Sequence, residues 1–188
     1  MKPSLSEAPL QVEPSSPLRV VFLTRRYWPL MSRAGRATAH LAAELAARNV
    51  HVTVLTARWN PRWPARIVCG GVPVVRLAPP PGQRRSASRY TKALARWLQK
   101  NQDQYVLLYI SALRHEAYAT LRSVRRGVPV VLRAEAAGRL GDCYWQLEAR
   151  DGRKIKQACM KADALVGSSR AIHRELIAAG FPRDRVHY

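Results

Sequence analysis

Few residues of this 188-residue chain stand at the spacing that a known chemistry requires. The pair His115–Glu116 is followed by alanine rather than histidine at position 119, so the zinc-protease pattern HExxH is absent. The GSS sequence at 167–169 lacks the spacing of a GxSxG nucleophile elbow, and helix capping explains its serines better. A P-loop sequence is also absent. We recognise no nucleophile with a partnering base and expect no metal site.

The segment from Leu18 to Asn49 is the best candidate for part of a binding site. A strand at 18–24 is followed by a polar loop and a helix, for which we expect Ser32 as the N-cap and Asn49 as a left-handed residue at the C-terminal end. Ligands of α/β sheets bind beyond the carboxyl ends of the strands, and a helix that starts there offers free backbone N–H groups to an anion. The loop is too long, and Gly35 too isolated, for a GxGxxG dinucleotide turn. The segment therefore predicts one anion-receptive wall of a cleft.

The elements that would position this wall alternate between strands and helices. Apolar, β-branched runs are typical of strands in a buried parallel sheet, and apolar residues at steps of three and four predict helices. This order predicts an α/β fold with a doubly wound, mostly parallel sheet and helices on both faces. The expected strands are 18–24, 50–56, 66–68, 72–77, 105–110, 128–132, 164–166 and the start of one at 185–188. The expected helices are 32–48, 89–100, 114–126, 146–161 and one between Ser168 or Ser169 and Gly180. The segment 133–145 is expected to be irregular.

Charge is the unusual bulk property, with 32 Lys and Arg against 12 Asp and Glu and a formal net charge of +20. This balance favours acidic partners, although arginines on solvated faces would give the same total. The pattern argues against nucleic acid as a partner, because the basic residues are spread along the chain and no known binding module is recognised. The helix at 89–100 has a basic side and an apolar side with Tyr90 and Trp97. That apolar side either packs on the sheet or inserts into a membrane surface.

Cysteine usage and the chain's first residues bear on its compartment. Cys69, Cys143 and Cys159 form no CxxC pair, which is typical of reduced thiols in a cytoplasmic protein. Residues 1–17 are rich in Pro and Ser and lack the apolar core of a secretory signal, so they predict a disordered tail. No run approaches the roughly 18 apolar residues of a membrane span. We expect one domain at 18–188, located in the cytoplasm, with at most peripheral contact at the inner face of the membrane.

With the strand, the long loop, Gly35 and the helix in place, the sequence resembles the N-terminal half of the family 4 (GT4) glycosyltransferases, which have the two-domain GT-B fold. The likeness is carried by RVVFLTRRYWPLMSRAGRATAHLAAELAARNVHVTVLT at 19–56, GVPVVLRAEAAG at 127–138 and KADALVGSSRAIHRELIAAGFPRDRVHY at 161–188. In the family, a stretch similar to the last block precedes the link to the second domain. The resemblance therefore implies that 18–188 is a Rossmann-like N-terminal domain and that a C-terminal donor-binding domain is missing from this chain.

The resemblance also implies a reaction. Such enzymes transfer a sugar, with retention, from a nucleotide-diphosphate sugar to an acceptor in the cleft between two domains. The N-terminal domain mainly holds the acceptor, a sugar or a lipid-linked molecule, and the donor is a substrate rather than a tightly bound cofactor. No metal is expected, and we expect the chain alone to be inactive. The alternative function is a basic polyanion-binding module, for nucleic acid or an anionic membrane surface, without catalysis.

Two groups of site residues follow from the resemblance. Gly35 matches the second glycine of the family's loop after the first strand, where backbone N–H groups approach phosphate or sugar oxygens. Ala34 stands where the family often has another glycine, and Arg33 or Arg36 could supply charge instead. Because the carboxyl ends of the strands share one edge, the loop residues Tyr27, Trp28, Ser111 and Asp142 are candidates for acceptor contacts.

Glu135 is the candidate catalytic residue. It lies near the place where many relatives have a histidine, just beyond the expected fifth strand. A carboxylate there could orient an acceptor hydroxyl or stabilise positive charge that develops at the sugar. Alternatively, it is a loop carboxylate paired with Arg133 or Arg139.

Overall fold

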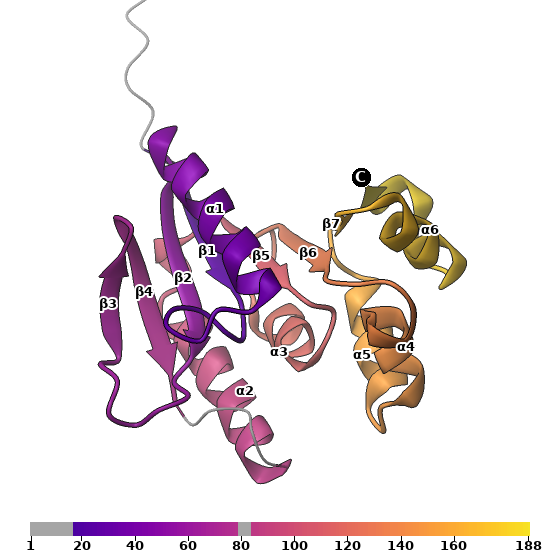
Figure 1. Ribbon diagram of the computed structural model, residues 1–188, viewed down its shortest axis with the longest axis horizontal. Coiled ribbons are helices and arrows are strands. Elements are labelled where there is room, and N and C mark those ends of the chain that lie inside the picture. The colour runs from indigo at the N-terminus through magenta and orange to yellow at the C-terminus, as the bar shows by residue number, and fades with distance from the viewer. Residues whose placement is uncertain (1–16, 79–83) are drawn as a thin grey trace, which may run out of the picture.

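An eight-stranded sheet forms the centre of the protein (Figure 1). The computed structural model describes residues 17–78 and 84–188, so the predicted tail, apart from Pro17, lies outside the described residues. The strands are β1 Arg19–Leu23, β2 His51–Ala57, β3 Arg66–Cys69, β4 Val72–Leu77, β5 Leu107–Ser111, β6 Val130–Ala134, β7 Ala164–Gly167 and β8 Val186–His187. They lie in the order β3-β4-β2-β1-β5-β6-β7-β8, and β3 pairs antiparallel with β4 while the other pairs are parallel. The predicted doubly wound, mostly parallel sheet is confirmed.

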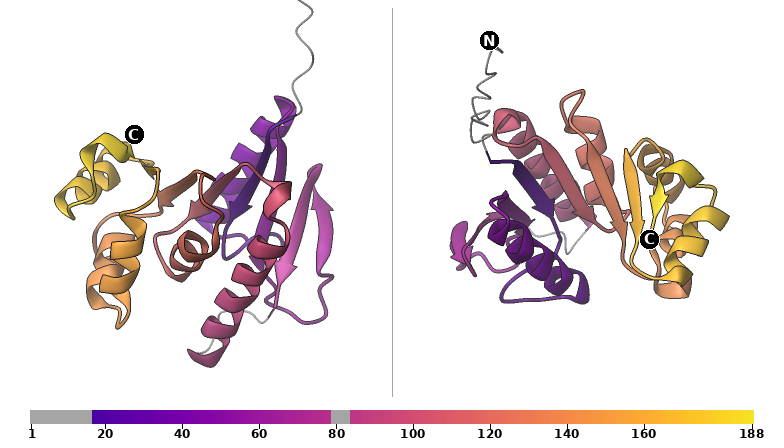
Figure 2. Two further views of the ribbon diagram at one scale, coloured as in Figure 1. Left: turned by 180° about the vertical axis from the view of Figure 1, so that it is seen from behind. Right: turned by 90° about the horizontal axis from the view of Figure 1, so that it is seen from above.

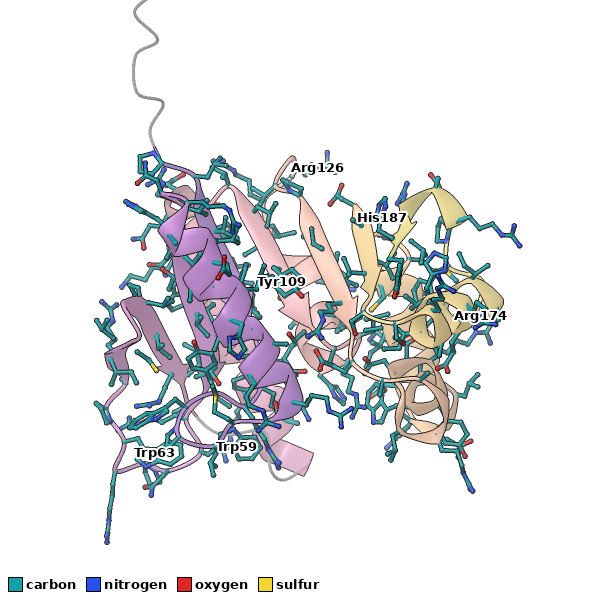
Figure 3. All side chains as sticks on the ribbon, turned by 45° about the horizontal axis from the view of Figure 1, so that its top comes forward. Trp59, Trp63, Tyr109, Arg126, Arg174 and His187 are labelled. Atoms are coloured by element: carbon teal, nitrogen blue, oxygen red, sulfur yellow. The ribbon has the colours of Figure 1, made fainter. Side chains whose placement is uncertain are left out.

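Helices cover both faces of the sheet, but unequally. They are α1 Arg33–Ala47, α2 Arg84–Lys100, α3 His115–Ser123, α4 Asp142–Glu148, α5 Gly152–Cys159 and α6 Arg170–Ala178, with short 3-10 turns at Gln102–Gln104, Gly138–Leu140 and Arg183–Arg185. Figure 2 shows α1 on one face and α2, α3 and α5 on the other. The side chain of Tyr109 on β5 lies on the α1 side, where the sheet beside α1 is open (Figure 3).

The larger hydrophobic core lies between the sheet and the α2–α3–α5 layer. Leu108, Ile110 and Leu132 from the strands and Leu94 and Leu98 from α2 are fully buried in it. Tyr90 is also buried, at 2% exposure. The apolar side of α2 therefore packs on the sheet. The alternative prediction, that this side inserts into a membrane surface, is wrong. Within the described residues, no helix is long and apolar enough to span a membrane.

Several predicted boundaries are confirmed by local geometry. The Ser32 hydroxyl accepts the backbone N–H of Gly35 at 3.0 Å and caps α1. Asn49 has φ of 60° after that helix, and Ser169 caps α6 by accepting the N–H of Ile172 at 3.2 Å. The three cysteines are free thiols, and Cys143 and Cys159 are buried.

The region between β6 and β7 departs from the prediction. The single helix expected at 146–161 is wrong, because α4 and α5 are separate helices joined by a turn. Gly152 starts α5 so close to α4 that a Cβ there would overlap the Gln146 carbonyl oxygen, and the turn therefore needs glycine. The segment 133–145 is also less irregular than expected, because β6 runs to Ala134 and α4 begins at Asp142. The helix expected at 114–126 ends earlier, at Ser123.

Candidate functional site

A pocket of about 550 Å³ lies where the chain order reverses, at the carboxyl ends of β1 and β5. This topological switch point is where ligands bind in doubly wound sheets. Loops after three strands and the first turn of α1 form the walls. The lining residues are Thr24, Arg25 and Arg26 after β1, Ser32 and Ala34 at the start of α1, Trp59 after β2, and Ser111, Ala112 and Arg114 around the end of β5.

Arg25 is held in place by a carboxylate from α3. Its Nε lies 2.6 Å from Glu116 Oε1, and its Nη2 donates to Oε2 at 3.0 Å. Burial alone would lower the pKa of Arg25, but the Glu116 carboxylate outweighs this effect and leaves the pKa above its ordinary value. Arg25 is thus a fixed cation whose charge is largely balanced within the wall.

Arg114 is paired in the same way with Asp142. Asp142 is fully buried, its Oδ1 accepts from Arg114 Nε at 2.8 Å, and its Oδ2 accepts the backbone N–H of Glu135 at 2.8 Å. The Arg114 guanidinium also lies 5.2 Å from the centre of the Trp145 ring. Asp142 therefore links the loops after β5 and β6 from below the surface. Its predicted role as a direct acceptor contact is wrong, because no face of the side chain reaches solvent.

Glu135 lies beside the pocket rather than among its lining residues. Its Oε1 is buried 3.6 Å from Arg133 Nη1 and has no hydrogen-bond partner in the described part of the chain. Burial raises the pKa of this carboxyl, and the Arg133 charge and the neighbouring Ser111 hydroxyl oppose that rise. The predicted pairing with Arg133 is confirmed, and a catalytic role stays a prediction.

At the start of α1, the backbone N–H and the space around Gly35 are already used by contacts within the protein. Gly35 is buried, its N–H is used by the Ser32 cap, and a Cβ there would overlap the Arg26 carbonyl oxygen. This glycine therefore serves close packing of the β1–α1 loop against the helix. In the first turn of α1, after the Ser32 cap, Ala34 lines the pocket. Its backbone N–H makes no hydrogen bond within the described ranges. Arg33 and Arg36 are exposed outside the pocket.

Tyr27 and Trp28 do not reach the pocket. Tyr27 is 3% exposed and packs in the smaller core with Phe22 and Val54, so its predicted acceptor contact is wrong. Trp28 is 51% exposed and lies outside the lining, where its carbonyl oxygen accepts from Arg76 Nη2 at 2.9 Å. Arg76 also donates to the Pro64 carbonyl at 3.0 Å and so ties the loop after β1 to the loop after β2.

Sequence reasoning missed the residues that dominate the pocket. The Arg26 guanidinium lies 5.1 Å from the centre of the Trp59 ring, and Trp59 Nε1 donates to the Arg25 carbonyl at 2.9 Å. Figure 3 shows Trp59 with Trp63 on the loop beyond β2. Only their position in the sequence could have indicated these residues as part of the site, because each follows closely on a strand of the parallel sheet.

Ala112, which lines the pocket, has an unusual backbone conformation. It has φ of 82°, a left-handed conformation that L-residues other than glycine adopt at a cost of about 1 kcal/mol or more. The conformation follows the end of β5, where the Ala112 N–H donates to the Arg133 carbonyl at 2.9 Å. Such strain persists where the surrounding contacts impose it, and it is concentrated at functional sites. Among residues 17–78 and 84–188, no group of three metal-ligating side chains comes together.

Comparison with solved structures shows the same fold in longer proteins. Sucrose-phosphate synthase from Thermosynechococcus elongatus is 13% identical with a TM-score of 0.66, and the match covers 90% of this chain and 47% of that one. HepE from Anabaena, in complex with UDP-glucose, is 15% identical with a TM-score of 0.61, covering 90% and 43%. A UDP-N-acetylglucosamine 2-epimerase from Rickettsia bellii is 13% identical with a TM-score of 0.57, also covering 90% and 43%. The chain thus spans about half the length of these proteins.

The sequence itself identifies the family. No curated protein matches the chain. The family model for the glycosyl transferase 4-like domain, however, matches residues 34–188, which include all of α1 except Arg33, the pocket-lining loops after β2 and β5, and the whole C-terminal half of the chain. The chain therefore belongs to the glycosyl transferase 4-like family, as a glycosyltransferase domain of the GT-B type.

Proposed function

We propose that this chain is the acceptor-binding half of a retaining hexosyltransferase that uses a nucleotide-diphosphate sugar as donor. The observation that carries the proposal is the pocket at the switch point, whose walls come from the loops after β1, β2 and β5. The UDP-glucose bound to HepE supports the donor class. Because the similar structures are about twice as long, we assign most donor contacts to a second domain, and we expect no transfer by this chain alone.

The pocket chemistry favours an acceptor that carries both hydroxyl groups and a negative charge. Thr24 and Ser111 supply hydroxyls, and the Trp59 ring supplies a flat apolar surface on which a sugar could pack. Arg25 and Arg114 are balanced by buried carboxylates, whereas Arg26 has no carboxylate partner in the part of the chain that is described. Arg26 is therefore the cation available to an anionic acceptor, such as a sugar phosphate or a lipid-linked phosphate.

Glu135 has a supporting role in this proposal. Its carboxyl is next to Ser111 and has a raised pKa because it is buried. A carboxyl of this kind holds or accepts a proton more readily than an exposed one, so it can orient an acceptor hydroxyl through Ser111. We further propose a cytoplasmic location, at the inner face of the membrane if the acceptor is lipid-linked, and the net charge of +20 favours such contact.

Calorimetric titration with glucose 6-phosphate, glucose and UDP-glucose tests the acceptor assignment. We expect glucose 6-phosphate to bind more tightly than glucose, and Arg26→Gln to weaken its binding by about tenfold, which is the loss of one charge-assisted hydrogen bond. Arg33→Gln is the matched control, because it removes an exposed arginine of the same region that does not line the pocket. Tightest binding of UDP-glucose, with the same dependence on Arg26, would instead place the donor in this half.

A further inference from the structure

A second hollow lies in the helical layer on the face of the sheet opposite α1. It has a volume of about 320 Å³ and lies between α3 and α5, which pack against each other (Figure 1). Its lining residues are Tyr118, Leu121 and Arg122 from α3, Lys154, Gln157 and Ala158 from α5, and Lys161 just after α5. None of these residues lines the pocket at the switch point. The hollow is therefore a separate candidate site.

One tyrosine that lines this hollow, Tyr118, lies close to two of its cations. The Arg122 guanidinium lies 5.6 Å from the centre of the Tyr118 ring, and the Lys154 ammonium lies 5.2 Å from it. Lys154, and with it Arg122, holds the pKa of the Tyr118 phenol below its ordinary value. The phenol and the two positive side chains therefore line the same space.

The charge of the hollow is uncompensated. Within the described ranges, Arg122, Lys154 and Lys161 make no ion pair, whereas Arg25, Arg48, Arg114, Arg125 and Arg133 each have a carboxylate within 4.0 Å. Among residues 17–78 and 84–188, no carboxylate lines this hollow. Asp151 lines an adjoining hollow of about 380 Å³ that shares Tyr118 and Lys154. Gathering like charges without a partner is unfavourable, and a bound anion would relieve the repulsion.

We propose that the hollow between α3 and α5 binds a phosphate group, carried either by a small phosphorylated molecule or by an anionic lipid headgroup. Arg122 can donate to two phosphate oxygens at once, the two lysines add positive charge, and Tyr118 and Gln157 add neutral donors. The small volume suits one or two phosphate groups better than a nucleic-acid backbone, which needs an extended stripe of contacts. The proposal does not rest on the transferase reaction, because it uses none of the residues of the switch-point pocket.

Calorimetric titration of the full chain with pyrophosphate tests the site. We expect saturable binding that Lys154→Gln and Arg122→Gln each weaken by about tenfold, because each variant removes one charge-assisted contact. Arg153→Gln is the matched control, because it removes one positive charge from an exposed neighbour of Lys154 that does not line the hollow. Arg26→Gln changes the separate switch-point pocket, so it is expected to leave the Lys154-dependent part of pyrophosphate binding unchanged. Equal weakening by Lys154→Gln and Arg153→Gln, or no saturable binding at all, would overturn the proposal.

Vesicle sedimentation distinguishes the two phosphate sources. Phosphatidylglycerol vesicles are compared with phosphatidylcholine vesicles, for the unchanged chain and for the Lys154→Gln and Arg153→Gln variants. Binding to the anionic vesicles that depends on Lys154 and is displaced by pyrophosphate assigns the site to a lipid headgroup. Pyrophosphate binding that depends on Lys154, without a matching vesicle effect, assigns it to a soluble phosphorylated molecule. Vesicle binding that is equally sensitive to both variants reports general charge attraction and contradicts a built site.

Discussion

Arg25 and Glu116 form a two-point ion pair that joins the end of β1 to the first turn of α3. Both guanidinium–carboxylate contacts are short, at 2.6 Å and 3.0 Å, and the Glu116 side chain is only 4% exposed. Because the chain leaves β1 and β5 toward opposite halves of the sheet, this pair ties the two sides together where the pocket opens. Its loss should therefore affect both stability and the pocket wall.

We predict that Glu116→Gln lowers the free energy of unfolding by about 2–3 kcal/mol, because the buried partner of a charged group is removed while Arg25 remains. Urea denaturation measures the change. Glu44→Gln is the matched control, since Glu44 pairs with Arg48 at 3.2 Å but is 69% exposed, and such a pair contributes about 0.5 kcal/mol or less. Equal losses in the two variants would contradict the structural role of the Arg25–Glu116 pair.

Gly35→Ala is expected to destabilise the protein although the position is helical. Alanine normally stabilises a helix interior relative to glycine, by up to about 1 kcal/mol. Here a Cβ would overlap the Arg26 backbone carbonyl, which a side-chain rotation cannot relieve. We predict a loss of about 2 kcal/mol or more in urea denaturation. At the neighbouring exposed position, Arg36→Ala should change stability by less than about 0.5 kcal/mol, and a neutral Gly35→Ala would show that the loop can move away.

The sequence predicted the architecture well because local patterns determine it. The apolar runs of β1, β2 and β5 and the caps at Ser32 and Ser169 depend on neighbours in the chain, and they were found at the expected places. The turn between α4 and α5 was missed because it depends on contact between Gly152 and Gln146, which periodicity does not report. Continuous amphipathic spacing across 146–161 instead suggested a single helix.

The site was predicted less well, for a different reason. The edge of the sheet follows from the strand order, so Ser111 and the start of α1 were placed correctly near the pocket. Which loop side chains face inward depends on tertiary contacts: Tyr27 turns into the core, and Asp142 turns inward to accept from Arg114. Both residue types are common in binding sites, and neither the tyrosine nor the aspartate carries a sequence signal of its burial.

The pH dependence of stability should reveal the raised pKa of Glu135. Because burial raises this pKa above its ordinary value of 4.5, the folded protein binds the Glu135 proton more tightly than the unfolded chain does. The carboxylate therefore penalises folding above the folded-state pKa, and the penalty disappears as the pH falls through that pKa toward 4.5. Glu135→Gln cannot ionise, so it should be more stable than the unchanged protein at neutral pH.

That advantage should shrink as the pH is lowered to about 4, where the native carboxyl is also protonated. Urea denaturation of both proteins across this range measures the difference. A variant that is less stable at neutral pH would mean that the contact with Arg133 outweighs the burial of the carboxylate. A difference that does not change with pH would assign the effect to packing rather than to the charge of Glu135.

Asp142→Asn tests whether the charge of the buried Asp142 carboxylate is needed to hold Arg114 and the loop at Glu135 in place. The amide keeps the shape of the carboxylate, but one of its two ends is now a donor. That end must face either Arg114 Nε or the Glu135 backbone N–H, both of which are donors at 2.8 Å. We predict a loss of about 2–4 kcal/mol in the free energy of unfolding, because a buried charged partner is removed. Asp103→Asn, whose partner Arg125 is 3.3 Å away and whose own side chain is 83% exposed, should cost less than about 0.5 kcal/mol.

Asp142→Asn should also weaken the binding of glucose 6-phosphate in the switch-point pocket. Arg114 lines the pocket and is oriented by Asp142 from below, so the neutral amide of Asp142→Asn would leave the Arg114 guanidinium free to move along the Trp145 ring. At a temperature where the variant is still folded, glucose 6-phosphate should bind it more weakly than it binds the unchanged chain, while pyrophosphate binding between α3 and α5 should be unaffected. Parallel loss at both sites would indicate general loosening of the fold, whereas selective loss would show that a fully buried carboxylate controls the pocket through Arg114.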